Sequence, residues 1–308
     1  MSGELTWDIR GKTVLVTGGN SGIGRATALE LARRGAEVVF TYRDEVRGRA
    51  AEEELRHALA AERMDTDGEA DRRGSVAGML LDLADFRSIL AFAQAFTERY
   101  PALHVLVHNA GVVLSERRET VDGFEATFGT NHMGAFILTR LLLEHLKRSA
   151  PARVVVVASG AHFKARHGLD FDDLQSKRRY DGVDVYGRSK LANILFTRAL
   201  AKRLEGTGVT ANCLHPGVVA SNFTGDGDAG GMWGFVFRYL RPFLLTTERG
   251  ARTSVHLAAC PELDGVSGEY FVRCRPATPS APARDDAAAE QLWQVSDALC
   301  GAASLPGY

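Results

Sequence analysis

Tyr186 and Lys190 stand four residues apart, and these two residue types together could exchange a proton. They lie in a segment with helical apolar spacing, so their side chains share one helix face. An ammonium group beside a phenol favours the phenolate, which lowers the pKa of the phenol from its usual value of about 10. Tyr186 would then serve as a general acid or base near neutral pH. The same spacing is common by chance, so a surface pair without a chemical role is the alternative.

Ser159 directly follows the apolar run Arg153–Ala158, which predicts a buried strand. In open α/β sheets, ligands bind at the carboxyl ends of the strands. A serine hydroxyl at that place could donate a hydrogen bond to a substrate oxygen and hold it beside Tyr186. The alternative is that Ser159 caps a turn, which is a common role of serine.

A glycine-rich stretch, TGGNSGIG at residues 17–24, stands between the first predicted strand and the first predicted helix. Gly18 permits a tight turn, Gly22 lets the backbone approach a pyrophosphate, and Gly24 allows the helix to pack close to the sheet. The N–H groups at the start of the helix would then face the phosphates. The spacing differs from the usual GxGxxG, and any strand-to-helix turn can use glycine. The position at the first junction nevertheless favours dinucleotide binding.

Arg43 and Asp44 follow the second predicted strand, where the adenosine ribose of a dinucleotide would lie. An acidic residue there binds the ribose 2′-hydroxyl of NAD, whereas an arginine accommodates the 2′-phosphate of NADP. We assign Arg43 to the ribose and Asp44 to the cap of the next helix, which predicts a preference for NADP(H). The alternative is that Arg43 is a solvated surface residue.

The elements that position these residues alternate along the chain. Short apolar runs predict the strands Thr13–Thr17, Ala36–Tyr42, Val76–Leu81, His104–His108, Arg153–Ala158, Val209–Leu214 and Gly268–Val272. Helical spacing predicts a helix at Arg25–Arg34, one from the Asp44 cap to Arg63, and others at Asp85–Arg99, Gly123–Arg148, Val185–Leu204, Thr247–Ala259 and Asp286–Leu299. Repeated strand–helix–strand units with right-handed crossovers make an α/β fold, a Rossmann-type doubly wound parallel sheet with helices on both faces.

The composition excludes several other classes of protein. The 308 residues carry a formal net charge of −1, which argues against a nucleic-acid partner. The four cysteines, Cys213, Cys260, Cys274 and Cys300, show no CxxC pairing, and no HExxH pattern occurs, so we expect no metal site and a cytoplasmic location. There is no apolar stretch long enough for a membrane-spanning helix, and the first residues do not resemble a signal peptide.

The segment Gly225–Leu245 begins with glycines and aspartates and then becomes apolar. We interpret it as a hinged lid over an apolar substrate. A buried core or subunit interface, or peripheral contact with a membrane surface, are the alternatives.

Together the motifs resemble the classical branch of the short-chain dehydrogenase/reductase superfamily, and more narrowly its retinol dehydrogenase-like group. They read TGGNSGIG (17–24), LDLAD (81–85), HNAG (108–111), NHMGAF (131–136), VVVASGAH (155–162), YGRSKLANILFTRALAKRL (186–204) and HPGVVAS (215–221). The resemblance runs from about Lys12 to Leu299. It implies a single domain over 1–308, with a cofactor-binding half at 12–111, a catalytic and substrate half at 112–275 and a C-terminal extension at 276–308.

The resemblance also implies roles for individual residues. Tyr186 would be the proton donor or acceptor, and Lys190 would lower its pKa and hold the nicotinamide ribose. Ser159 would position the substrate, and Asn131 would hold a water in a proton relay. The implied cofactor-binding residues are Gly18, Asn20, Ser21, Gly22, Ile23, Gly24, Arg43, Asp82, Leu83, Asn109, Ala110, Gly111, Tyr186, Lys190, Pro216, Gly217, Val219 and Ser221.

The predicted function is therefore NADP(H)-dependent interconversion of an apolar alcohol and its aldehyde or ketone, with NAD(H) as the alternative cofactor. Two departures, His108 in HNAG and Ala158 before Ser159, are not expected to remove activity. The alternatives are a non-catalytic NADP(H)-binding sensor or scaffold, because a fold does not fix a function, and a C=C reductase. The resemblance further implies a homodimer or homotetramer through the helices Gly123–Arg148 and Val185–Leu204.

Overall fold

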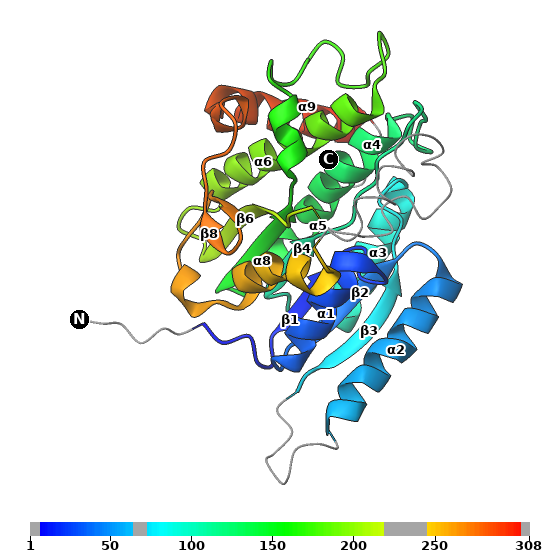
Figure 1. Cartoon of the computed structure of the whole chain (residues 1–308), viewed down its shortest axis with the longest axis vertical. Coiled ribbons are helices and arrows are strands. Elements are labelled where there is room, and N and C mark those ends of the chain that lie inside the picture. The colour runs from blue at the N-terminus through cyan, green and yellow to red at the C-terminus, as the bar shows by residue number, and fades with distance from the viewer. Residues whose placement is uncertain (1–6, 64–72, 219–244, 303–308) are drawn as a thin grey trace, which may run out of the picture.

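The computed structural model describes residues 7–63, 73–218 and 245–302. Its centre is an 8-stranded sheet with the order β3-β2-β1-β4-β5-β6-β7-β8 (Figure 1). The strands are β1 Thr13–Val16, β2 Glu37–Tyr42, β3 Ser75–Leu80, β4 Val105–His108, β5 Ala152–Val157, β6 Val209–His215, β7 Tyr270–Val272 and β8 Arg275–Pro276. Every neighbouring pair is parallel except β7 and β8. The predicted doubly wound parallel sheet is confirmed.

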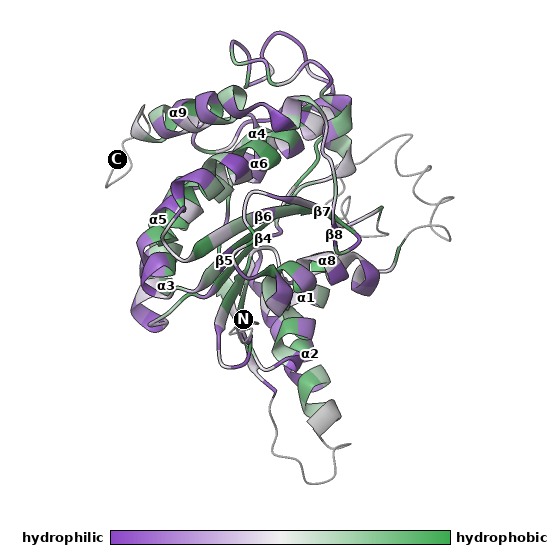
Figure 2. Cartoon of the chain, turned by 90° about the vertical axis from the view of Figure 1, so that its left-hand side faces the viewer, coloured by the Kyte–Doolittle hydropathy of each residue, from purple (hydrophilic) through white to green (hydrophobic). Residues whose placement is uncertain are grey.

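Helices cover both faces of the sheet (Figure 2). Their bounds are α1 Gly22–Arg33, α2 Glu45–Arg63, α3 Phe86–Arg99, α4 Ala126–Phe128, α5 Gly134–Arg148, α6 Gly182–Arg203, α8 Thr247–Ala259 and α9 Asp286–Ala302. α1, α2 and α8 lie on one face, and α3, α5 and α6 lie on the other. Because the inner strands are covered on both sides, β1, β4 and β5 are buried along their whole length, which explains their continuous apolar sequence.

The helix predicted over Gly123–Arg148 is interrupted, and this corrects the sequence prediction. Helix α4 begins only after Glu125, whose buried carboxylate accepts hydrogen bonds from the N–H groups of Thr127 and Phe128. A π-helical turn, Gly129–Met133, then precedes α5. Such turns insert one extra residue into a helix and often occur at functional sites. Apolar periodicity does not reveal this extra residue.

Aspartate caps set the starts of α3 and α6. Asp85 caps α3 by accepting from the N–H groups of Arg87 and Ser88, so the predicted start at Asp85 holds within one residue. Asp181 caps α6 in the same way, and α6 therefore begins at Gly182, earlier than the predicted Val185.

Arg153 and Trp7 close the edge of the sheet at the amino ends of the strands. The Trp7 indole donates a hydrogen bond to the carbonyl oxygen of Ala258 at 3.1 Å. The Arg153 guanidinium lies 4.0 Å from the centroid of that indole and donates to the carbonyl oxygens of Leu257 and Cys260. These carbonyls belong to the end of α8, where the helix dipole favours a cation.

Helix α9 covers the outer sides of α5 and α6. Its Trp293 indole stacks on Phe196 with ring centroids 6.0 Å apart and meets Phe136 edge-on at 4.9 Å. The Arg203 guanidinium lies over the same indole at 4.2 Å. Part of the apolar surface of α5 and α6 is thus covered by a helix of the same chain. The expected homodimer or homotetramer through these helices stays a prediction.

Within the described ranges, none of the helices combines the length and the apolar character needed to cross a bilayer. The same ranges hold no group of three or more histidine, cysteine, aspartate or glutamate side chains that could bind a metal ion.

Candidate active site

The predicted site residues gather at the carboxyl edge of the sheet, because four neighbouring parallel strands end there. The glycine turn follows β1, Asn109 follows β4, Ser159 comes two residues after β5, and Pro216 follows β6. This is the edge where open α/β sheets bind their ligands.

The glycine turn is built for close contact with the backbone. Gly18 and Gly22 have positive φ angles of 63° and 55°, which side-chain-bearing residues rarely adopt. A β-carbon at Gly24 would lie 2.3 Å from the carbonyl oxygen of Gly18, so only glycine lets α1 approach so closely. Ser21 precedes α1 but makes no side-chain cap bond to it. An uncapped helix start beside a glycine cradle fits the phosphates of a dinucleotide.

Asn109 fastens the glycine turn to β4. Its side-chain amide donates to the carbonyl oxygens of Thr17 and Gly18, at 2.9 and 3.2 Å. The Thr17 hydroxyl accepts from the N–H groups of Asn109 and Ala110. Because these bonds join Asn109 and Ala110 to Thr17 and Gly18, they hold the glycine turn in shape.

The two residues after β2 lie beside this turn, because Gly18 and Gly19 bond to Thr41 in β2. Asp44 caps α2 by accepting from the N–H group of Arg47 at 2.8 Å, as predicted. Arg43 is exposed at the same edge.

The loop after β3 carries the next two predicted residues. The carboxylate of Asp82 is half-buried and accepts from the N–H group of Ala84 at 2.9 Å. Leu83 is buried, and its carbonyl oxygen lies against Gly134 at the start of α5, where a β-carbon would be 2.5 Å away. Leu83 therefore packs this loop against α5.

Helix α6 holds Tyr186 and Lys190 on one face, as their spacing predicted. The Lys190 ammonium lies 5.6 Å from the centroid of the Tyr186 ring and donates to the carbonyl oxygen of Val157, the last residue of β5. Ser159 bonds to the phenol of Tyr186, and its hydroxyl oxygen accepts from the N–H group of Ala161 at 3.1 Å. The structure thus brings Ser159, Tyr186 and Lys190 together.

Asn131 joins this group from the π-helical turn. Its amide pairs with both backbone groups of Val112, at 2.7 and 2.9 Å, and donates to the hydroxyl of Ser189, which donates to the carbonyl oxygen of Tyr186. A β-carbon at Gly111 would lie 3.2 Å from the Asn131 amide oxygen and 3.3 Å from the Lys190 nitrogen. The side chain of Asn131 therefore positions α6; the predicted water contact stays a prediction.

The pKa of Tyr186 in the structure differs from the one that its spacing to Lys190 predicts. Burial raises the pKa of Tyr186 to about 12, and the hydrogen bond from Ser159 only partly opposes this effect. Burial also lowers the pKa of Lys190 to about 8, because a buried ammonium loses its hydration. The prediction that Lys190 depresses the pKa of the phenol is wrong for the chain alone, since burial of the phenol raises its pKa and Ser159 is the group that opposes this effect.

The comparisons with known proteins identify this arrangement. A family model described as short chain dehydrogenase matches residues 12–170 and 174–229. The chain belongs to the short-chain dehydrogenase family. Retinol dehydrogenase 12 of Mus musculus is 47% identical over 294 residues, which cover 95% of this chain and 87% of that protein. Retinol dehydrogenase 14 of Homo sapiens is 46% identical over 304 residues, with coverages of 95% and 87%. The retinol dehydrogenase-like group is therefore confirmed.

Solved structures agree with this placement in the family. A crystal structure of an uncharacterized protein from Mycobacterium Paratuberculosis superposes with a TM-score of 0.73 at 32% identity, covering 96% of this chain and 95% of that one. The Pseudomonas aeruginosa RhlG/NADP active-site complex gives a TM-score of 0.64 at 26% identity, with coverages of 86% and 95%. The chain is thus an oxidoreductase of this family that uses a nicotinamide dinucleotide.

The departure from the family motif at His108 has a structural reason. The His108 ring is buried, and its Nε2 atom lies 2.7 Å from the hydroxyl of Thr139. That hydroxyl donates to the carbonyl oxygen of Ala135, so Nε2 carries the proton and donates to it. Burial lowers the pKa of His108 to about 3, and the ring stays neutral. His108 is therefore a core residue that ties β4 to α5.

Some predictions fall outside the described part of the chain. Pro216 and Gly217 are described, and Gly217 has a positive φ of 90°. Val219, Ser221 and the segment Gly225–Leu245, apart from Leu245 itself, lie outside the described residues.

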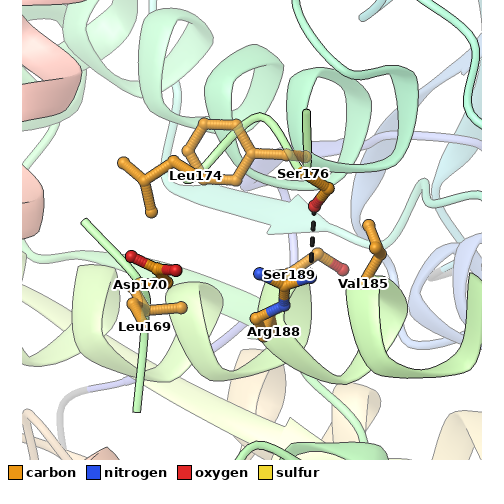
Figure 3. Close-up of a pocket in the computed structure, with 8 residues that line it drawn as sticks. Leu169, Asp170, Leu174, Ser176, Val185, Arg188 and Ser189 are labelled. Atoms are coloured by element: carbon orange, nitrogen blue, oxygen red, sulfur yellow. Dashed lines mark hydrogen bonds between the residues drawn. The ribbon is translucent and has the colours of Figure 1, made fainter. Parts of the chain in front are cut away.

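A small cavity lies between α4, residues 169–176 and α6 (Figure 3). It has a volume of about 10 Å³ and is lined by Phe128, Leu169, Asp170, Leu174, Ser176, Val185, Arg188 and Ser189. This is room for about one water molecule, so the cavity is too small to receive a substrate.

The sequence reasoning missed two histidines at the Ser159 turn. The side chain of His162 is fully buried and bonds to the backbone of Ser159. His215 accepts a hydrogen bond from the N–H group of Gly160. The only available signal was their presence in the motifs that contain Ser159 and Pro216.

Proposed function

We propose that the protein is an NADP(H)-dependent oxidoreductase that interconverts an apolar alcohol and its aldehyde or ketone. The observation that carries this proposal is the junction of Ser159, Tyr186 and Lys190 at the carboxyl edge of the sheet, next to the glycine cradle. The names of the similar retinol dehydrogenases supply the substrate class.

The residues of this chain would polarise and protonate a carbonyl oxygen. The Ser159 hydroxyl and the Tyr186 phenol are hydrogen-bonded to one another, so a substrate oxygen that reaches both would accept from both in place of that bond. Tyr186 would then deliver its proton to that oxygen as general acid. A bound nicotinamide dinucleotide supplies the hydride. Lys190, held by the carbonyl oxygen of Val157, would bind the nicotinamide ribose.

We propose carbonyl reduction as the cellular direction, because a cellular pool rich in NADPH favours hydride transfer to a carbonyl. Burial raises the pKa of Tyr186, so the phenol is protonated at neutral pH and can act as the acid that this direction needs.

The choice of NADP(H) rests on Arg43. It is exposed directly after β2, beside the glycine turn, while the neighbouring carboxylate of Asp44 caps α2. A guanidinium at this place suits the 2′-phosphate of NADP.

The apolar substrate is supported by the sequence of Gly225–Leu245 and by the names of the relatives. We propose that this segment is the substrate lid. The free cysteines of the chain fit a reducing compartment, so we propose a cytoplasmic location.

Cofactor oxidation by the purified protein tests the function. NADPH and NADH are each supplied with a retinoid aldehyde, a long-chain aldehyde, an aromatic ketone and, as polar control, a triose ketone. We expect NADPH oxidation with the apolar carbonyls and an alcohol as product. A product that keeps its carbonyl group but has lost a C=C bond would show a C=C reductase. Tight NADPH binding with no product would favour a sensor or scaffold.

A further inference from the structure

The turn that carries Ser159 is held from both sides by imidazole rings. On one side, the Gly160 N–H group donates to Nδ1 of His215 at 3.1 Å. On the other, Nδ1 of His162 lies 2.6 Å from the carbonyl oxygen of Ser159. Both contacts are with the peptide group that joins Ser159 to Gly160, so they hold the backbone from which the Ser159 side chain projects.

The bonds require opposite tautomers of the two rings. The N–H group of Ser280 donates to Nε2 of His162 at 3.1 Å, so that nitrogen has a free lone pair and the proton is on Nδ1. Nδ1 of His162 therefore donates to Ser159. His215 accepts at Nδ1 from Gly160, so its proton is on Nε2. Both rings act as neutral imidazoles.

The rings have little freedom to adopt another arrangement. His162 is fully buried, with its centroid 4.1 Å from that of Phe163 and 5.2 Å from that of Tyr270. A β-carbon at Gly160 would lie 3.3 Å from Nε2 of His215, so glycine lets that ring rest against the turn. The contact with Ser280 further ties the serine turn to the segment before α9.

We propose that His162 and His215 are positioning residues that hold the Ser159 hydroxyl against Tyr186 and the substrate oxygen. This inference rests on the proposed catalytic role of Ser159. Among the described residues, the hydrogen bonds and ring contacts of His162 and His215 do not reach the glycine turn or Lys190, so we expect their loss to act on the chemical step. His215 also precedes Pro216, an implied cofactor-binding residue, so NADPH affinity is compared within each pair of variants. A displacement of about 1 Å at a reacting group can reduce a rate by 10²-fold.

Paired amide substitutions test each bond with the same chemistry. Asparagine places its amide where Nδ1 of histidine stands, whereas glutamine reaches the position of Nε2. His215→Asn keeps an acceptor for Gly160, and His162→Asn keeps a donor for Ser159; the two glutamine variants lose these bonds. We expect kcat of each asparagine variant to exceed that of its glutamine partner by roughly tenfold or more. His167→Leu, at an exposed position of the same loop, is the matched control and should retain the wild-type kcat.

The measurements are kcat, the dissociation constant for NADPH and the thermal midpoint, with kcat expressed per NADPH-binding site so that unfolded protein does not count. We expect equal NADPH affinity within each asparagine–glutamine pair. Equal kcat for asparagine and glutamine at both positions would overturn the inference. Ser159→Ala separates this failure from failure of the proposed function. If Ser159→Ala keeps full turnover, the assigned role of Ser159 is wrong. If Ser159→Ala loses turnover while all four variants keep it, only the positioning inference falls.

Discussion

Replacing Lys190 by methionine should change the pH dependence of stability in a way that its burial dictates. Lys190 is 2% exposed, and its pKa falls from 10.5 to about 8 in the folded chain. Each pKa unit corresponds to about 1.4 kcal/mol, so the charged ammonium costs the fold about 3 kcal/mol at pH values below 8. Methionine has a similar length and carries no charge.

The sign follows from proton binding. Between pH 8 and 10.5 the unfolded chain holds a proton on Lys190 that the folded chain has released, so the free energy of unfolding rises with pH there. Below pH 8 both states are protonated and the penalty is constant. From pH 7.5 to 10, wild type should therefore gain about 2 kcal/mol relative to Lys190→Met.

Urea unfolding of both proteins at pH 7.5, 8.5, 9.25 and 10 measures this difference. Lys202→Met, at an exposed position of the same helix, controls for the loss of one positive charge. A wild-type minus Lys190→Met difference that stays constant over this range would refute the lowered pKa, and with it the account of Lys190 as a desolvated ammonium.

Three further substitutions have expected outcomes. Arg43→Ala should raise KM for NADPH by roughly 10- to 100-fold and leave KM for NADH nearly unchanged, because it removes a charge-assisted contact with the 2′-phosphate. Equal effects on both cofactors would show that Arg43 does not determine the preference for NADP(H). Gly24→Ala should abolish NADPH binding measured by fluorescence, because its β-carbon would meet the turn, whereas Gly301→Ala, which meets nothing within 4 Å, should bind normally. Arg153→Met should lower the free energy of unfolding by about 2 kcal/mol with unchanged kcat, since it removes hydrogen bonds at the end of α8 far from Ser159. A loss of kcat with unchanged stability would contradict the structural role of Arg153.

Most of the sheet could be predicted from the sequence, because its strands are buried on both faces and read as continuous β-branched runs. Val154–Val157 in β5 is the clearest case. The glycine turn and the Tyr186–Lys190 pair were equally readable, since glycine geometry and helical spacing are local properties. Sequence spacing was enough where the role of a residue depends only on its neighbours in the same helix, strand or turn.

The failures involve contacts between distant segments or the effect of burial. His162 acts through Ser280, which is 118 residues away, and no spacing rule connects the two. The π-helical turn at Gly129–Met133 changes the helix by a single residue, which leaves the apolar periodicity nearly unchanged. The pKa of Tyr186 was predicted from its charged neighbour Lys190, whereas desolvation by the surrounding protein determines its direction.

The most direct test of the central claim is turnover by Tyr186→Phe. NADPH oxidation with the best apolar carbonyl is measured for wild type and variant, together with NADPH binding by fluorescence. If Tyr186 is the proton donor, kcat falls by about 10²- to 10⁴-fold while the dissociation constant for NADPH is unchanged. Turnover by Tyr186→Phe at the wild-type rate would contradict the account.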